Sequence, residues 1–152
     1  MTNGPTLAPR LLGRAENARA VLGRILGASD MTYHEWVALT LASAADSTVA
    51  SNQLVGRMVG ALNIDRATAR GAIARLIGAV LLEPDEPSHL RLSDAGRERY
   101  GRLRAAVDES VARLNADIPA EDLATAGRVL SELTARANDQ LAQPGKEESH
   151  AR

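Results

Sequence analysis

Two arginines and a threonine at the start of one short helix are the residues of this chain best suited to chemistry. They are Arg66, Thr68 and Arg70, in the stretch "LNIDRATARGAIARLIGAVLLE" of residues 62–83. A helix N-terminus favours anions through its free N–H groups and its dipole. Arginine can pair bidentately with guanine, and threonine can contact a base or a phosphate. The three side chains therefore indicate either contact with DNA or an ordinary solvated surface.

A helix-turn-helix is predicted to position these side chains. Asp65 is the predicted cap of the helix that carries them, and Asn63 tolerates the left-handed end of the helix before it. That preceding helix is predicted over residues 52–62, with Ser51 as its cap. Two helices joined by so short a turn are typical of a helix-turn-helix.

A small β-hairpin is predicted directly after the second of these helices. The runs "AVLLE" (79–83) and "HLRLS" (89–93) flank the turn "PDEPS". Pro84 and Pro87 limit the pairing of the two runs, because proline has no N–H to donate. A helix-turn-helix followed at once by a hairpin is the winged-helix arrangement.

Longer apolar helices precede and follow this central unit. Apolar residues recur at helical steps over residues 6–28. The next helix opens with Thr32 and Glu35 at the spacing of a capping box. A long helix begins at Ser93, and Pro119 breaks it and can begin the last one.

The order of elements predicts a mainly α fold, a winged helix-turn-helix with a short β-hairpin wing and long N- and C-terminal helices. The apolar stripes of those long helices need a partner, most economically a second copy of the chain. We expect one domain, residues 1–152, with a DNA-binding lobe at about 30–92. Residues 6–28 and 93–142 would form dimerisation helices, and 143–152 a flexible polar tail.

From about Leu7 to Leu141, the sequence resembles the MarR family of transcriptional regulators. The matching segments are "TYHEWVAL", "SNQLVGRMVGALNIDRATARGAIARLIGAVLL" and "LRLSDAGRERYGRL". The Leu-Thr-x-x-Gly pattern of the family corresponds here to Leu92, Ser93, Asp94, Ala95 and Gly96. The resemblance implies a homodimer, a recognition helix in the major groove and often a small-ligand pocket between the dimer helices and the DNA-binding lobe.

Two features depart from the family pattern. Members usually carry an Asp-Arg-Arg-like motif in the wing, whereas the loop "EPDEPSH" is short, acidic and without arginine. This puts contact between the wing and the minor groove in doubt. Members also commonly have glycine at the end of the recognition helix, where this chain has Val80. We therefore expect an altered helix end.

The candidate DNA contacts lie in three segments. They are Arg66, Ala67, Thr68, Arg70, Gly71 and Arg75 on the recognition helix, Ser51, Asn52 and Gln53 on the preceding helix, and His89 and Arg91 in the wing. Arg75, Arg91 and Arg97 are candidates for phosphate contact, and each can equally be a plain surface charge. Capping alone explains Ser51. Gly71 in mid-helix can be explained by close approach of the helix to DNA, or equally by neutral drift that the helix tolerates.

The charge distribution supports this interpretation modestly. The chain has a net charge of −1, but residues 51–82 carry +3 and residues 90–104 carry +3. Residues 105–152 carry −4. The positive charge is thus concentrated in the predicted DNA-binding lobe and the helix that follows it.

The resemblance to the MarR family also implies a second partner, a small aromatic or anionic effector. Its predicted pocket lies where the second helix meets the first and the fifth, near Tyr33, His34, Trp36 and either Arg10 or Arg14. An arginine there could pair with a carboxylate, and aliphatic walls could hold a ring. Core packing is the competing explanation for Trp36.

Other classes of function find little support in the sequence. There is no Cys, and the three His residues lack metal-ligand spacing, so we expect no metal site and no cofactor. No catalytic triad, glycine-rich phosphate loop or carboxylate pair indicates an enzyme. No apolar run is long enough for a membrane span, and the N-terminus lacks the pattern of a signal peptide, so we expect a cytoplasmic protein.

The leading interpretation is a dimeric, sequence-specific DNA-binding regulator of transcription, a repressor released by a small ligand. The alternative is a winged-helix protein-interaction module that no longer binds DNA, and the acidic wing is its main support. Retention on heparin or on random duplex DNA at low salt would separate the two.

Overall fold

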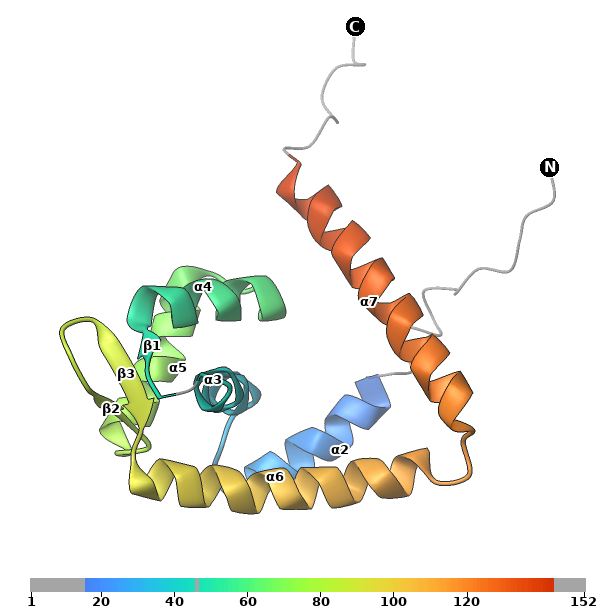
Figure 1. Ribbon diagram of the computed structural model, residues 1–152, viewed down its shortest axis with the longest axis horizontal. Coiled ribbons are helices and arrows are strands. Elements are labelled where there is room, and N and C mark those ends of the chain that lie inside the picture. The colour runs from blue at the N-terminus through green and yellow to red at the C-terminus, as the bar shows by residue number, and fades with distance from the viewer. Residues whose placement is uncertain (1–15, 46, 144–152) are drawn as a thin grey trace, which may run out of the picture. The chain divides into compact units, whose positions relative to one another are not determined.

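The computed structural model describes residues 16–45 and 47–143. Its helices are α2 (Glu16–Gly27), α3 (Tyr33–Ser43), α4 (Ser51–Leu62), α5 (Arg66–Gly78), α6 (Asp94–Asn115) and α7 (Ala120–Ala142), and its strands are β1 (Val49–Ala50), β2 (Leu82–Pro84) and β3 (His89–Leu92) (Figure 1). This order confirms the predicted mainly α fold with a helix-turn-helix and a wing. Of the predicted first helix, residues 6–15 lie outside the described residues.

The chain divides into two compact units, Met1–Ser110 and Val111–Arg152. The first unit contains α2 to α5, the sheet and most of α6, and the second contains the end of α6 and α7. The finer boundaries expected for a DNA-binding lobe and for dimerisation helices remain a prediction.

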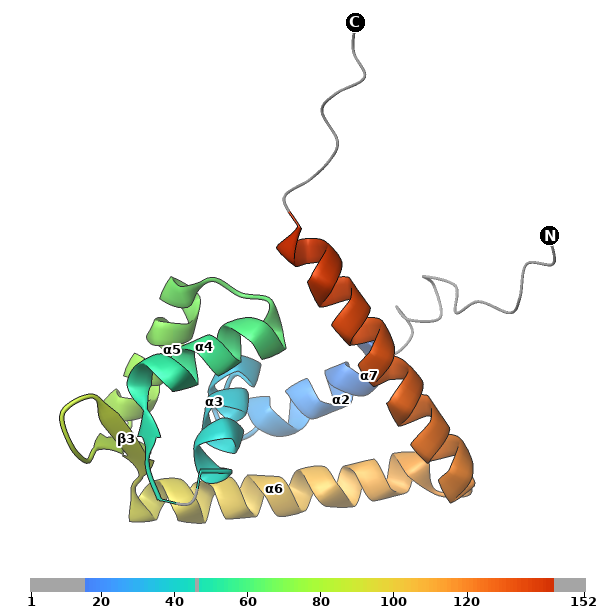
Figure 2. The same ribbon diagram turned by 45° about the horizontal axis from the view of Figure 1, so that its top comes forward.

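Helix α3 lies at the centre of the first unit. It packs against α2, α4, α5 and β3, and both views place it between α4 and α6 (Figures 1 and 2). This central place explains why the sequence of α3 is apolar on most sides. The largest fully buried side chains of the core are apolar and not aromatic: Leu26, Leu39, Leu54, Val55, Met58, Leu76 and Leu82.

The wing is a three-stranded antiparallel sheet with the strand order β1-β3-β2. Leu82 pairs with Leu92 in the hairpin, and Val49 pairs with Leu90 on the other side of β3. The hairpin was predicted, whereas β1 was not, because a strand of two residues has no readable alternation. The first predicted run is also too long, since β2 begins only at Leu82.

The predicted caps are confirmed at three helix ends and wrong at a fourth. Thr32 and Glu35 form a complete capping box, the Asp65 side chain caps α5, and Asn63 is left-handed with φ 51°. Ser51, however, is the first residue of α4 and not its cap. The N-cap residue is Ala50, which has no capping side chain, and the backbone N–H of Ser51 instead donates to the Ser88 carbonyl at 2.8 Å.

The end of α5 keeps a regular geometry despite its valine, so the expected alteration is wrong. Val80 adopts φ 56°, the left-handed conformation that glycine adopts most easily. The backbone N–H of Val80 donates to the Ile77 carbonyl, and that of Leu81 donates to the Leu76 carbonyl at 2.9 Å. These two bonds form a Schellman motif. The burial of Leu81 anchors the turn from the protein interior.

Ser93 joins the end of α5 to the start of α6. Its hydroxyl donates to the Val80 carbonyl at 2.6 Å and accepts from the backbone N–H of Gly96 at 2.9 Å. Ser93 thus opens α6, as predicted, while it also holds the corner after α5.

Helix α7 in the second unit has no buried residue. Its Leu130, Leu133 and Leu141, together with Val111, Leu114 and Ile118 before it, are large apolar side chains exposed in this single chain. None of the described helices is both long and apolar enough to cross a membrane.

Candidate nucleic-acid interface

Helix α5 has one buried face and one exposed face. Ala69, Ala72, Ile73 and Leu76 are buried and fix the helix in the core of the first unit. The predicted contact residues Arg66, Ala67, Thr68, Arg70 and Arg75 are exposed, and Gly71 is half-buried. The helix therefore turns outward the face that the sequence assigned to DNA.

The side chains on the exposed face of α5 are small along its centre and polar or cationic along its two edges. Residues three or four apart share one face of a helix. By this spacing Ala67, Gly71, Ala74 and Gly78 form the central stripe, with Arg66 and Arg70 on one side and Thr68 and Arg75 on the other. Such a face lets the helix backbone come close to another surface while the long cations reach outward along its flanks.

The first turn of α5 is fixed by its cap. The backbone N–H of Thr68 donates to Asp65 Oδ1 at 2.6 Å. This bond, followed by one from the Thr68 hydroxyl, lowers the pKa of Asp65 below its ordinary value. The Thr68 hydroxyl thus already has a partner in the cap, a structural role that competes with base contact.

Arg75 is tied to another helix. Its Nε donates to Glu35 Oε1 at 2.7 Å, and the Arg75 side chain is 57% exposed while that of Glu35 is 10% exposed. The sequence placed Glu35 only in the capping box, because an ion pair between residues so far apart in the chain has no local signal.

At the start of α4, Asn52 and Gln53 are exposed, and Ser51 is half-buried beneath the wing loop. Helix α4 packs against α5 and β1. The predicted contact residues of α4 therefore lie on a helix that adjoins both α5 and the wing.

The arginine of the wing is paired with the acids of the wing. Arg91 Nε donates to Glu83 Oε1 at 2.8 Å, and a second ion pair joins Arg91 to Asp85 at 3.7 Å. His89 Nδ1 lies 3.4 Å from the Pro87 carbonyl. The wing thus offers little uncompensated positive charge.

The predicted effector residues have different surroundings. Trp36 is 7% exposed and stacks on Tyr100 of α6, with ring centroids 5.2 Å apart. His34 is half-buried. Tyr33 lines a cavity of about 270 Å³ between α2 and α3, where the Arg19 guanidinium lies 5.0 Å from the centre of its ring. Arg10 and Arg14 lie outside the described residues.

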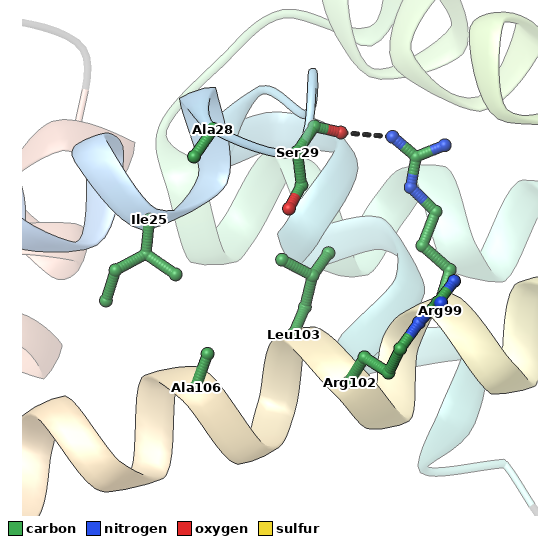
Figure 3. A pocket seen from close by; sticks show the side chains of 7 residues that line it. All are labelled: Ile25, Ala28, Ser29, Arg99, Arg102, Leu103 and Ala106. Atoms are coloured by element: carbon green, nitrogen blue, oxygen red, sulfur yellow. Dashed lines mark hydrogen bonds between the residues drawn. The ribbon is translucent and has the colours of Figure 1, made fainter.

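A second cavity, of about 560 Å³, lies between the end of α2 and the first half of α6 (Figure 3). Its apolar lining is Ile25, Ala28, Leu103 and Ala106, and its polar lining is Ser29, Arg99 and Arg102. Arg99 donates a hydrogen bond to the Ser29 carbonyl. Arg102 is 73% exposed, with Glu98 3.7 Å away. The positive charge of residues 90–104 was visible in the sequence, and the first and fifth helices were expected at the effector pocket, but the hydrogen bond between Arg99 and Ser29 was not predicted.

Several solved structures have a fold similar to that of this chain. NadR in complex with 4-hydroxyphenylacetate is 25% identical, with a TM-score of 0.68, covering 86% of this chain and 96% of NadR. BpsR from Bordetella bronchiseptica is 20% identical with a TM-score of 0.67, covering 86% and 98% of the two chains. The reduced form of MarR from E. coli is 17% identical with a TM-score of 0.65, covering 88% and 97%.

Neither a family model nor a curated protein matches the sequence. The structural neighbours, however, are MarR-family regulators, as the resemblance of the sequence implied. This chain therefore has the winged helix-turn-helix fold of MarR-family regulators of transcription.

Proposed function

We propose that this protein is a cytoplasmic, homodimeric, sequence-specific DNA-binding regulator of transcription, a repressor released by a small aromatic acid, and not an enzyme. The observation that carries the proposal is the exposed face of α5, with its small central stripe and its Arg66, Arg70 and Arg75 flanks. The fold shared with MarR-family regulators supports it.

In this proposal α5 is the recognition helix and lies in the major groove. The central stripe lets its backbone approach the base edges, and Arg70 and Thr68 reach bases from the first turns. Arg66 and Arg75, with Asn52 and Gln53 of α4, serve the phosphates on either side. Because Arg91 is paired with Glu83, the wing adds little to the affinity.

Dimerisation follows from the exposed apolar side chains. Leu130 is 46% and Leu133 is 38% exposed in the single chain, and α7 buries no residue. A second copy would cover these side chains and present two recognition helices to two half-sites. Light scattering should give twice the chain mass of 16.1 kDa. A folded, monodisperse monomer at micromolar concentration would refute this part of the proposal.

Effector binding is proposed at α2. The ligand of NadR is the aromatic acid 4-hydroxyphenylacetate, and BpsR is regulated by 6-hydroxynicotinic acid. The cavity of α2 and α6 has apolar walls for a ring and Arg102 for a carboxylate. The cavity at Tyr33, with Trp36 and His34 nearby in sequence, is the alternative place. Binding regulates only if the ligand prefers one conformation of the dimer.

Selection of fragments from the genomic DNA of the source organism tests the central claim. The purified protein should enrich a small set of fragments that share a repeated half-site, and Arg70→Ala should lose the enrichment. Enrichment of no fragment would sink the proposal of sequence-specific binding.

The protein-interaction module remains the second candidate, and the pairing of Arg91 with Glu83 and Asp85 favours it. A module that has lost DNA binding should fail to bind heparin or random duplex at low salt. Retention that falls steeply as salt rises would favour the DNA-binding regulator.

A further inference from the structure

The Glu35 carboxylate lies between two partners at the start of α3. Its Oε2 accepts from the backbone N–H of Thr32 at 2.9 Å, and its Oε1 accepts from Arg75 Nε at 2.7 Å. The residue is 8% exposed. Both oxygens are therefore held in place, and the carboxylate has a fixed position relative to the backbone of α3.

A fixed carboxylate gives Arg75 a fixed direction. A bond to Nε uses the side of the guanidinium nearest the chain and leaves its two terminal nitrogens for other partners. Within residues 16–45 and 47–143, no hydrogen bond of the Arg75 side chain other than that with Glu35 is found. The Nη1 atom lies beside Gly71, 4.0 Å from where a Cβ of that glycine would stand. The Nη1 atom thus lies along the face of α5 that carries Gly71.

We propose that Glu35 is a positioning residue for DNA binding, which acts through Arg75 and holds its guanidinium toward a phosphate beside α5. The inference rests on the proposed function, since it requires α5 to lie against DNA. An arginine held in its bound geometry loses less side-chain entropy on binding. Glu35 therefore favours binding although its own charge repels phosphate.

The competing interpretation is that Glu35 merely neutralises Arg75, in which case its removal would tighten DNA binding. The two interpretations predict opposite changes in DNA affinity when the charge of Glu35 is removed. A third possibility, a purely structural role in the capping box, predicts lower stability without a change in the affinity of the folded protein.

The test uses a labelled duplex of random sequence, because phosphate contacts are independent of sequence. Glu35→Gln keeps the shape of the side chain and removes its charge. The matched control is Thr32→Ala, which opens the same capping box without touching Arg75. Both variants are first compared by thermal unfolding, and duplex affinity is then measured at several salt concentrations where both are folded.

Glu35→Gln should weaken duplex binding by roughly three- to ten-fold, and Thr32→Ala should leave it unchanged. In an Arg75→Gln background, Glu35→Gln should have no further effect. Arg75→Lys keeps the charge but loses the Nε bond, so it should also bind more weakly than the wild type. This surface substitution serves as the test if Glu35→Gln does not fold.

Tighter or unchanged binding by Glu35→Gln, or an equal loss with and without Arg75, would overturn the inference. If Arg75→Lys has to serve as the test, duplex affinity equal to that of the wild type would overturn the inference. If the wild type itself fails to bind the duplex at low salt, the proposed function fails and the inference with it. Wild-type binding with an unaffected Glu35→Gln refutes the inference alone.

Discussion

Gly96 lies directly against the backbone of Leu81, so closely that a Cβ on the glycine would be 2.0 Å from the Leu81 carbonyl oxygen. Leu81 is the buried residue that ends the Schellman motif of α5, and Gly96 is in the first turn of α6. The close approach lets the Ser93 hydroxyl hold Val80 and Gly96 together. The need for glycine at the end of the pattern Leu92 to Gly96 thus has a steric explanation.

Replacing Gly96 should therefore destabilise the fold strongly. Gly96→Ala must push α6 away from the corner after α5, and we expect a loss of about 2–4 kcal/mol in the free energy of unfolding. The control is Gly101→Ala in the same helix, where nothing lies within 4 Å of the added Cβ. That variant should gain up to about 1 kcal/mol from helix propensity. Equal stabilities of the two variants in urea unfolding would contradict the close packing.

The second prediction concerns the proposed DNA contacts of α5. Arg70→Ala should weaken binding to a selected operator by about 1–3 kcal/mol, because a bidentate base contact is lost. Arg70 is exposed, so the unfolding free energy should hardly change. Thr68→Ala should also weaken binding, with a small loss of stability from its hydroxyl bond to Asp65. Unchanged operator affinity in both variants would remove α5 from the interface.

The third prediction concerns the ion pair between Glu83 and Arg91 in the wing. Glu83→Gln should release Arg91, whose Nη2 is 2.7 Å from Glu83 Oε1. Binding to random duplex should then tighten slightly at low salt, and the salt slope should steepen by at most about one. Neutralising Asp85 and Glu86 together should act in the same direction through reduced repulsion. Weaker binding by these variants would mean that the acids orient Arg91 toward DNA.

Acid stability provides the fourth prediction. Burial raises the pKa of Glu35, but the hydrogen bonds from Thr32 and Arg75 outweigh it and hold the pKa below its ordinary value of 4.5. As the pH falls, the Glu35 carboxylate of the unfolded chain is therefore protonated before that of the folded protein. The resulting stabilisation is fully present above about pH 4.5 and is lost as the pH falls through the lower folded pKa.

Glu35→Gln removes this titration. The unfolding free energy of the variant should fall less steeply than that of the wild type between about pH 5 and pH 3. Thr32→Ala, which keeps the carboxylate and Arg75, should retain most of the wild-type slope. Parallel curves for Glu35→Gln and the wild type would show that Glu35 has the same pKa in both states.

Local signals in the sequence predicted most of the fold. The capping box at Thr32, the cap at Asp65 and the left-handed Asn63 depend on neighbouring residues, and all are confirmed. The regular end of α5 at Val80 was missed, because the burial of Leu81 holds that turn and burial has no local signal there. β1 was missed because a strand of two residues shows no alternation and because its partner strand, β3, is distant in sequence.

The candidate interface shows the same limit. The exposed face of α5 follows from helical period and could be predicted, whereas the pairing of Arg75 with Glu35 joins residues 40 positions apart. The meeting of Arg99 with Ser29 joins residues 70 positions apart. The first contact depends on how α3 packs against α5, and the second on how α6 lies against the residues that follow α2. No periodicity within one segment reveals such packing.

The last prediction concerns the signal that releases DNA. A sensor that works through sulfenic acid or a disulfide requires Cys, and this chain has none, so moderate peroxide should leave DNA binding intact. An aromatic acid such as salicylate or 4-hydroxyphenylacetate should instead lower operator affinity. Trp36 is the only Trp, and it stacks on Tyr100, one residue from Arg99 in α6. Its fluorescence should therefore change over the same concentration range as the loss of DNA binding.

Substitution of Arg102 tests whether the cavity between α2 and α6 is the proposed effector site. Arg102→Gln should shift both the fluorescence and the DNA-release curves to higher ligand concentration, by roughly ten-fold if a charged hydrogen bond to the carboxylate is lost. The matched control is Arg97→Gln, also exposed on α6 but outside the cavity and paired with Asp94. Equal shifts in the two variants would reduce the effect to general surface charge. Reversible release by peroxide, with neither signal moved by millimolar aromatic acid, would disprove the effector hypothesis.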